Sequence, residues 1–233
     1  MVHDGSLVDT TEMYLRTILE LEEEGVPALR ARIAERLHQS GPTVSQTVGR
    51  MERDALLTVE GDRHLALTDF GRAKAVEVMR KHRLAELLLV NVIGMPYEEA
   101  HEEACRWEHV MSKTVERKVY ALLGKPTRSP YGNPIPGLAE FDGGSVLTAA
   151  VVDAAERNLA AQGVSGKVVV SRICESLQTD AELLRQLHAA GMDPGARVVV
   201  AQEADTDTVI IERDGDSLRL PREVASRVFV AVE

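Results

Sequence analysis

A segment rich in proline and glycine divides this sequence into two parts with different patterns. It runs from Lys125 to Gly144 and contains four prolines and four glycines. Proline lacks the amide hydrogen that a helix needs, and glycine in a helix interior costs conformational entropy. The segment therefore cannot be a regular helix. We interpret it as a linker, which could also dock on another part of the chain.

The part before this segment begins with three stretches that predict helices. Apolar residues recur at helical spacing from Thr10 to Glu24, where a glycine and a proline follow. A second helix fits Arg30 to Leu37. After a turn that contains Gly41, a third helix fits Pro42 to Leu56, with Ser40 as its cap. A short helix, a tight turn and a longer helix predict a helix-turn-helix.

The next segments predict a hairpin and two long helices. Two short alternating runs, 57–60 and 64–68, flank Gly61-Asp62-Arg63 and predict a β-hairpin, a candidate wing. One helix is expected from Thr68 toward Val90 and another from about Tyr97 to Leu123. Beyond the Pro- and Gly-rich segment, strand-like runs separated by turn residues favour a small β-barrel; they cover 167–173, 197–202, 208–212 and 217–220.

Length and charge limit the classes of protein that fit. The 233 residues suit two or three domains. The net charge of -10 argues against nonspecific binding to nucleic acid, yet residues 28–53 carry five arginines against two acids. A local basic surface therefore persists, which suits a DNA-binding protein that needs assistance to bind.

The same sequence favours the cytoplasm. No apolar run approaches the roughly 20 residues of a membrane-spanning helix, and the first residues lack the basic and apolar regions of a signal peptide. The two cysteines, Cys105 and Cys174, are far apart in sequence and do not indicate a disulfide framework. We expect Cys174, which follows an apolar strand, to be buried.

Two groups of residues indicate a metal-binding protein. Cys105, Glu108 and His109 have the spacing of one helical face, and a thiolate, a carboxylate and an imidazole together suit Fe(II), Co(II), Ni(II) or Zn(II). Alternatively, they form a solvated face with a core cysteine. His82 and Glu86 are one turn apart, and two antiparallel helices could bring them to a histidine on the next helix. Alternatively, His82 belongs to an exposed basic strip.

The sequence offers no catalytic motif. His101-Glu102 could begin the zinc-protease motif, but the second histidine that this motif requires is replaced by Cys105. We find no glycine-rich phosphate loop and no nucleophile elbow. We therefore expect a protein that is not an enzyme.

Several stretches closely resemble the diphtheria-toxin-repressor family of iron-dependent regulators. The resemblance covers about Leu7 to Leu138 and is carried by VDTTEMYLRTILELEEEG, LRARIAERLHQSGPTVSQTV, MRKHRLAELLL, EACRWEHVMS and RSPYGNPIPG. It implies a mainly α fold with β structure, which comprises a winged helix-turn-helix DNA-binding domain (1–73), a helical metal-binding and dimerisation domain (74–140), a linker (141–150) and a C-terminal SH3-like small β-barrel (151–233).

The resemblance also implies two metal sites. The primary, activating site would use Met13, Cys105, Glu108 and His109. The ancillary site would use His82, Glu86, His101, Glu175 and Gln178. Related manganese regulators have carboxylates in place of the two sulfur ligands, so the resemblance favours Fe(II) in the cell. Co(II), Ni(II), Mn(II) or Zn(II) should substitute in vitro.

We expect the start of the third helix to enter the major groove of DNA. Gln46 could read an adenine edge and Pro42 a thymine methyl group, and part of the specificity would come from DNA shape. Thr43, Ser45 and Arg30 would hold phosphates, and Ser40 lies at the same end of the helix. Arg53 and Arg63 are candidate clamps on the DNA backbone, or alternatively solvated charges.

The expected function is that of a metal-activated repressor of iron-uptake and related genes. Palindromic operators imply a two-fold homodimer, with one or two dimers on an operator. Trp107 could supply an apolar dimer contact with Val90, Ile93 and Val110, or it could lie in the core. The resemblance implies that Val2 to Asp9 obstruct DNA docking without metal, and that the 128–137 segment can dock on the SH3-like domain.

Two other classes of function stay open at this point. A metalloenzyme or metal-storage module could use the same ligands, although it leaves the helix-turn-helix unexplained. A regulator that responds to an organic ligand would have structural histidines and cysteines, and chelators would not affect its DNA binding.

Overall fold

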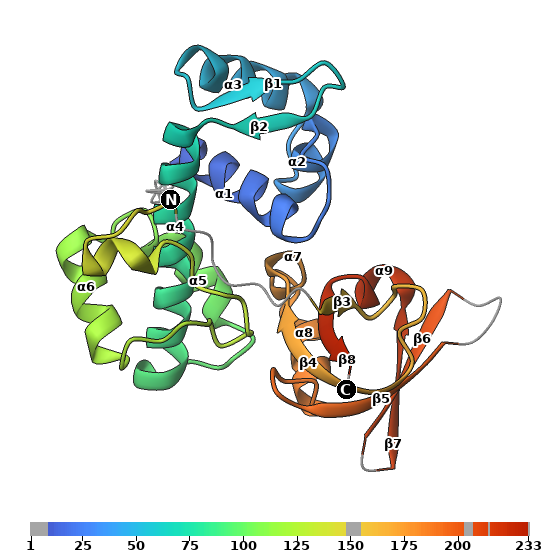
Figure 1. The fold of residues 1–233 in the computed structure, drawn as a ribbon. Coiled ribbons are helices and arrows are strands. Elements are labelled where there is room, and N and C mark those ends of the chain that lie inside the picture. The colour runs from blue at the N-terminus through green and yellow to red at the C-terminus, as the bar shows by residue number, and fades with distance from the viewer. Residues whose placement is uncertain (1–8, 148–154, 203–206, 214, 233) are drawn as a thin grey trace, which may run out of the picture. The chain divides into compact units, whose positions relative to one another are not determined.

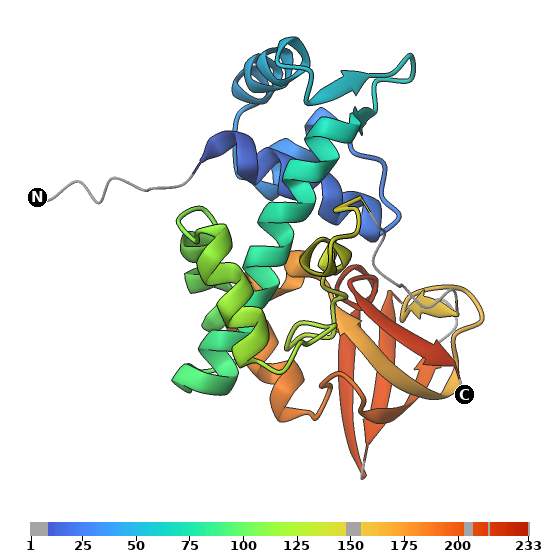
Figure 2. The ribbon, with the colours of Figure 1, turned by 60° about the vertical axis from the view of Figure 1, so that its left-hand side comes forward.

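The computed structural model describes residues 9–147, 155–202, 207–213 and 215–232 (Figures 1 and 2). These residues divide into two compact units. Of the described residues, the first unit comprises 9–85, 103–126 and 135–147, and the second comprises 86–102, 127–134, 155–202, 207–213 and 215–232. The domain boundaries expected from the sequence stay a prediction. The expectation for Val2 to Asp9 falls, apart from Asp9, outside the described residues.

The first unit begins with the expected helix-turn-helix. It contains α1 (Thr10–Glu23), α2 (Arg30–Arg36) and α3 (Gly41–Arg53). The Asp9 carboxylate caps α1 by accepting hydrogen bonds from two backbone amides. The Ser40 hydroxyl caps α3 by accepting a hydrogen bond from the Thr43 amide at 3.4 Å, as predicted. The sequence thus specifies where both helices begin.

The recognition helix ends three residues earlier than the predicted Leu56. Ala55 has a positive φ of 56°, a left-handed conformation that a helix cannot continue through. The chain then forms the expected hairpin from β1 (Leu57–Val59) and β2 (Leu65–Leu67), which pair antiparallel. Arg63, also with a positive φ, lies in the turn of this wing.

Apolar side chains from α1, α2, α3 and the hairpin share one core. Its fully buried members come from every element and include Leu15, Ile18, Ile33, Val44 and Val48. Because Val44 and Val48 lie one turn apart, α3 packs on one face and leaves the opposite face to solvent. The core therefore fixes which side of α3 is available for DNA.

The helices that follow the wing differ in one respect from the prediction. After α4 (Asp69–Leu88) and a π-helical turn, η1 (Leu89–Ile93), two helices replace the single helix predicted over 97–123: α5 (Ala100–Trp107) and α6 (Lys113–Leu122). Ser112, which lies between the two helices, caps α6 by accepting a hydrogen bond from the Val115 amide at 3.3 Å. Within the described ranges, no helix is long and apolar enough to cross a membrane.

A buried arginine attaches part of the Pro- and Gly-rich segment to the helices. Arg80 on α4 forms an ion pair with Glu116 of α6 at 2.7 Å and donates to the Gly137 carbonyl at 2.9 Å. Its guanidinium also lies 4.6 Å from the centre of the Phe141 ring, in a 3-10 turn, η2 (Leu138–Asp142). These contacts hold η2 against α4 and α6.

The second unit contains an antiparallel sheet of six strands in the order β3-β8-β4-β5-β6-β7. The strands are β3 (Glu156–Asn158), β4 (Gly166–Ile173), β5 (Arg197–Gln202), β6 (Thr208–Arg213), β7 (Asp216–Pro221) and β8 (Val228–Val232). The four predicted strands, β4 to β7, are confirmed, whereas β3 and β8 were not predicted. The helices of this unit were not predicted either: α7 (Glu175–Gln178), α8 (Ala181–Ala189) and α9 (Arg222–Ala225).

The 127–134 part of the Pro- and Gly-rich segment docks on the end of β4. The Ile173 amide donates to the Tyr131 carbonyl at 2.9 Å, and the Asn133 side chain donates to the Ile173 carbonyl at 2.7 Å. Gly132 has a φ of 83°, and a Cβ on it would lie 2.1 Å from the Ser171 carbonyl oxygen. Glycine is therefore required at this contact.

Candidate metal centre and DNA-binding surface

Cys105, Glu108 and His109 lie at the C-terminal end of α5. Cys105 is on the helix, and the other two belong to the turn after Trp107. The Glu108 amide still donates to the Ala104 carbonyl at 3.0 Å, so helical spacing continues into the turn. This geometry brings Glu108 Oε1 to 3.3 Å from His109 Nε2.

These two atoms indicate that the cluster fits a metal ion. Glu108 Oε1 and His109 Nε2 are buried and have no hydrogen-bond partner among the residues that the structure describes. A buried polar atom without a partner costs about 1–3 kcal/mol. A divalent cation would accept a lone pair from each atom, and the nearby Cys105 thiol adds a soft ligand. The donor set of nitrogen, oxygen and sulfur suits a transition metal.

His82 on α4 joins this cluster. Its side chain is fully buried, and its Nδ1 atom lies 2.7 Å from Glu108 Oε2. Arg80 is fully buried as well. The alternative interpretation of His82 as part of an exposed basic strip is therefore wrong.

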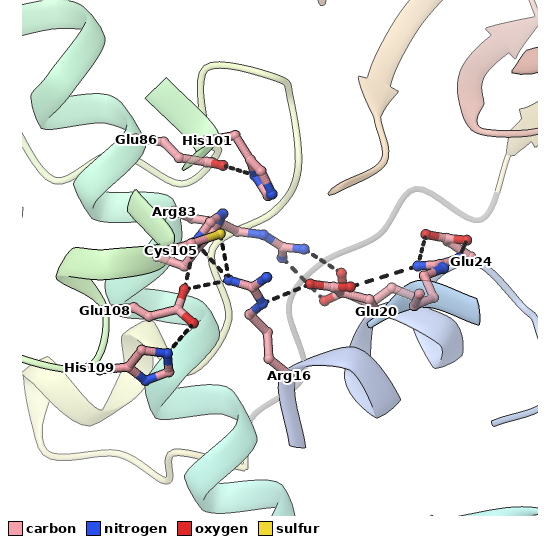
Figure 3. Close-up of polar contacts among 12 residues, drawn as sticks. Arg16, Glu20, Glu24, Arg83, Glu86, His101, Cys105, Glu108 and His109 are labelled. Atoms are coloured by element: carbon pink, nitrogen blue, oxygen red, sulfur yellow. Dashed lines mark hydrogen bonds and ion pairs between the residues drawn. The ribbon is translucent and has the colours of Figure 1, made fainter. Parts of the chain in front are cut away.

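Arg16 on α1 supplies positive charge to the same cluster (Figure 3). One of its nitrogens, Nη1, lies 2.6 Å from Glu108 Oε2 and 3.3 Å from the Cys105 sulfur. Burial alone would raise the pKa of Glu108, but the Arg16 charge and the hydrogen bond to His82 lower it below its usual value. Glu108 is therefore ionised, the form that binds metal.

A second residue of α1 contacts the cluster next to Met13. Glu12 Oε2 lies 2.6 Å from His109 Nδ1. Met13 follows Glu12, precedes Arg16 by three residues and is half-buried. Met13 therefore lies on the segment of α1 that reaches the cluster, and its role as a sulfur ligand stays a prediction.

Sequence reasoning did not find Glu12 or Arg16. Arg16 and Glu20 form an ion pair one turn apart, at 2.9 Å, on a helix with mostly buried residues. This charged pair in a partly buried helix was the one local signal that Arg16 belongs to a site, because two buried charges require further partners. The cluster partners of Arg16 and Glu12, Glu108 and His109, are 92 and 97 positions away in sequence, which periodicity does not reveal.

The other predicted ancillary ligands lie in the second unit. Glu86 Oε1 and His101 Nδ1 are 3.2 Å apart, and both side chains are buried. Glu175 and Gln178 lie on α7 and are also buried. Gln178 donates to the Ile173 carbonyl at 2.7 Å, while its oxygen has no hydrogen-bond partner in the described part of the chain. The structure thus pairs Glu86 with His101, and metal binding by Glu175 and Gln178 stays a prediction.

The residues predicted to contact DNA lie mainly on one exposed surface. The residues at the N-terminal end of α3 with exposed side chains are Ser40, Pro42, Thr43, Ser45 and Gln46. Arg53 and Arg63 are exposed as well, and Arg30 is half-buried. The hydroxyls of Ser40 and Thr43 are 2.8 Å apart, within the helix cap. Specific contacts of these residues with DNA stay a prediction.

A winged helix-turn-helix joined to a buried cluster of metal-ligand residues defines a class of protein, the metal-responsive DNA-binding regulators. Comparison with known proteins agrees with this class. Residues 6–65 match the family model described as the iron dependent repressor N-terminal DNA binding domain. Residues 68–137 match the iron dependent repressor metal binding and dimerisation domain, and residues 157–232 match the FeoA domain.

Individual relatives match nearly the whole chain. The iron-dependent repressor IdeR of Mycobacterium leprae is 56% identical over 226 residues, which cover 97% of this chain and 98% of the relative. The diphtheria toxin repressor of Corynebacterium glutamicum is 51% identical over 225 residues, 96% of each chain. A solved manganese-dependent transcriptional repressor in complex with manganese has a TM-score of 0.81 at 28% identity, covering 96% of this chain and 100% of its own. The chain belongs to the iron-dependent repressor family.

Proposed function

We propose that this protein represses transcription when Fe(II) occupies the centre built around Cys105, Glu108 and His109, and that it then binds palindromic operators of iron-uptake and related genes. The observation that carries the proposal is a pair of buried atoms, Glu108 Oε1 and His109 Nε2, which lie 3.3 Å apart near the Cys105 thiol and have no hydrogen-bond partner among the described residues. A relative named as an iron-dependent repressor is 56% identical to this chain, and a diphtheria toxin repressor is 51% identical. Both sulfur ligands expected of an iron regulator are present, Met13 and Cys105.

A bound divalent ion supplies positive charge and draws lone pairs toward one point. The chain's own residues convert this into a response. Glu12 and Arg16 connect α1 to the cluster, so the cluster and the helix-turn-helix share one element. Metal needs only to favour the arrangement that binds DNA, and couplings between sites of about 1–3 kcal/mol are typical. These roles require binding and no catalysis.

The proposal assigns DNA recognition to α3. Its polar end is exposed while Val44, Val48 and Met51 hold the opposite side in the core. Gln46 is exposed on α3, and we assign it contact with a base edge. A regulator of this kind acts where the DNA is, so we place it in the cytoplasm. Co(II), Ni(II), Mn(II) or Zn(II) should replace Fe(II) in vitro.

We assign the homodimer contact to apolar residues left exposed near α6. Val110 is 57% exposed and Leu122 is 66% exposed, so both side chains offer apolar surface to a partner. Trp107 is half-buried, and its indole nitrogen donates to Glu103 one turn earlier at 2.7 Å. These side chains suit an isologous two-fold interface, as palindromic operators require. One or two dimers could occupy an operator.

Fluorescence anisotropy with a palindromic iron-box duplex tests the proposal at fixed salt and without oxygen. Wild type should bind with Fe(II) and release the duplex when chelator is added. Cys105→Ala should lose the metal-dependent binding, whereas Cys174→Ala, which replaces a buried cysteine of the second unit, should retain it. Equal binding in all samples would contradict the metal switch and favour a regulator with another signal. Metal binding without DNA binding would favour a storage module or an enzyme.

A further inference from the structure

Arg16 makes contacts that a metal centre of this kind does not require. Its side chain is only 11% exposed. The nitrogen Nη1 lies 2.6 Å from Glu108 Oε2, 3.3 Å from the Cys105 sulfur and 3.2 Å from His82 Nδ1. Figure 3 shows the side chain reaching from α1 to Cys105 and Glu108. A single guanidinium thus contacts two of the proposed ligands of the primary centre.

The contacts of Arg16 use lone pairs of two proposed ligands, the Cys105 sulfur and Glu108 Oε2, whereas Arg16 does not engage Glu108 Oε1. A guanidinium has only donors, so its contacts with the sulfur and the carboxylate draw on their lone pairs. A lone pair of Cys105 or Glu108 engaged in this way is not available for coordination. Two cations that share one buried group of ligands also repel each other strongly, because the local dielectric is low. Arg16 and a divalent metal therefore compete for the cluster.

The other side of Arg16 leads toward the DNA-binding elements. Its Nε atom lies 2.9 Å from Glu20 Oε1, one turn along α1. The other carboxylate oxygen of Glu20 lies 3.7 Å from Arg36 Nη1 on α2, and Arg36 also donates to Glu24 at 3.0 Å. A continuous series of charged contacts thus joins the cluster to α2, the helix that precedes the recognition helix.

From these contacts we infer that Arg16 is an internal counter-ion of the metal centre, which competes with metal for Cys105 and Glu108 and transmits its displacement to α2 through Glu20 and Arg36. The inference rests on the proposed function, because it names the residue that opposes metal binding at the same centre. Without metal, the positive charge of Arg16 neutralises the negative charge of the cluster. When metal displaces it, Arg16 retains Glu20 as its partner, and the attraction between Glu20 and Arg36 weakens.

Anaerobic titration with Co(II) alone tests the competition. The thiolate-to-Co(II) absorption reports on coordination by cysteine and needs no DNA. Arg16→Gln should bind Co(II) at least about fivefold more tightly than wild type, the lower end of typical couplings between sites. Arg72→Gln is the matched control, since Arg72 forms an exposed ion pair with Glu22 of α1. It should bind Co(II) like wild type.

Two further variants separate the parts of the inference. If Arg16→Gln does not fold, Arg16→Met removes the charge and the donors while it keeps an unbranched apolar side chain, so Co(II) should again bind more tightly. Arg36→Gln should leave Co(II) affinity unchanged and reduce the factor by which metal increases DNA affinity. Unchanged or weaker Co(II) binding in both Arg16 variants would overturn the competition, and an unchanged factor in Arg36→Gln would overturn the transmission. If wild type itself does not bind Co(II) through Cys105, the proposed function fails instead.

Discussion

Replacing Arg80 with methionine should destabilise the first unit by about 3–5 kcal/mol, the usual cost of removing one partner from a buried ion pair. Arg80 and Glu116 are each 1% exposed and are joined at 2.7 Å. Without Arg80, the Glu116 carboxylate is left buried with no opposite charge at hand, and the Gly137 carbonyl loses its donor. Methionine fills much of the space, so the loss reports mainly on charge.

Urea denaturation followed by far-UV circular dichroism measures this loss of free energy of unfolding. Arg106→Met is the control, because Arg106 is 61% exposed and its ion pair with Glu103 is on the surface, where such pairs contribute about 0–1 kcal/mol. The double variant Arg80→Met, Glu116→Gln should recover part of the loss, because the buried charge of Glu116 is removed as well, while Glu140, the other ion-pair partner of Arg80, is 26% exposed and keeps its contact with Lys113. A loss for Arg80→Met as small as that for Arg106→Met would refute the reasoning.

Three other substitutions address the docked segment, DNA recognition and pH. Gly132→Ala should release the 127–134 segment and speed hydrogen exchange of the Ile173 amide, which donates to that segment. Gly163→Ala is the control, because Gly163 has a similar φ of 84° but open space around it, and it should leave this exchange rate unchanged. Equal effects of the two substitutions would contradict the contact. Gln46→Ala should weaken operator binding by about 1–3 kcal/mol and relax discrimination at one base pair, which anisotropy with base-substituted duplexes measures. An equal loss of affinity for all duplexes would instead indicate that Gln46 contacts a phosphate. Burial raises the pKa of Glu77, but Lys81 and Lys113 lower this pKa overall, below its ordinary value of 4.5. The stability that Glu77 contributes is therefore present above pH 4.5 and declines as the pH falls below that value. Glu77→Gln should flatten this pH dependence in denaturation curves, and an unaltered slope would contradict the ion pairs.

The parts of the fold that could be predicted are those specified by local signals. Ser40, the turn before it and the spacing of apolar residues were enough to locate the helix-turn-helix and its cap. The end of α3 was missed because it depends on a left-handed Ala55, a residue with no preference for that conformation. The break between α5 and α6 was underestimated, although Ser112 is a good capping residue. The strand β3 pairs with β8, and β8 also pairs with β4, so both strands that were missed depend on partners far away in sequence.

The candidate metal centre also has residues that local sequence signals predict and residues that they do not. Cys105, Glu108 and His109 were grouped from their spacing, because a helix brings residues three and four apart together. The contacts of His109 with Glu12 and of Cys105 with Arg16 join residues 97 and 89 positions apart, and only the tertiary fold brings them together. Spacing alone also could not show that His82 is buried. Local pattern thus predicts the ligands, and packing supplies the charges that control them.

The most direct test of the proposed centre is the absorption spectrum of the Co(II)-loaded protein without DNA. Wild type and Cys174→Ala should show thiolate-to-Co(II) charge transfer, and Cys105→Ala should not. Glu108→Ala and His109→Ala should bind Co(II) much more weakly, because each removes one ligand. Charge transfer that survives in Cys105→Ala, or that disappears in Cys174→Ala, would contradict a metal centre built on Cys105.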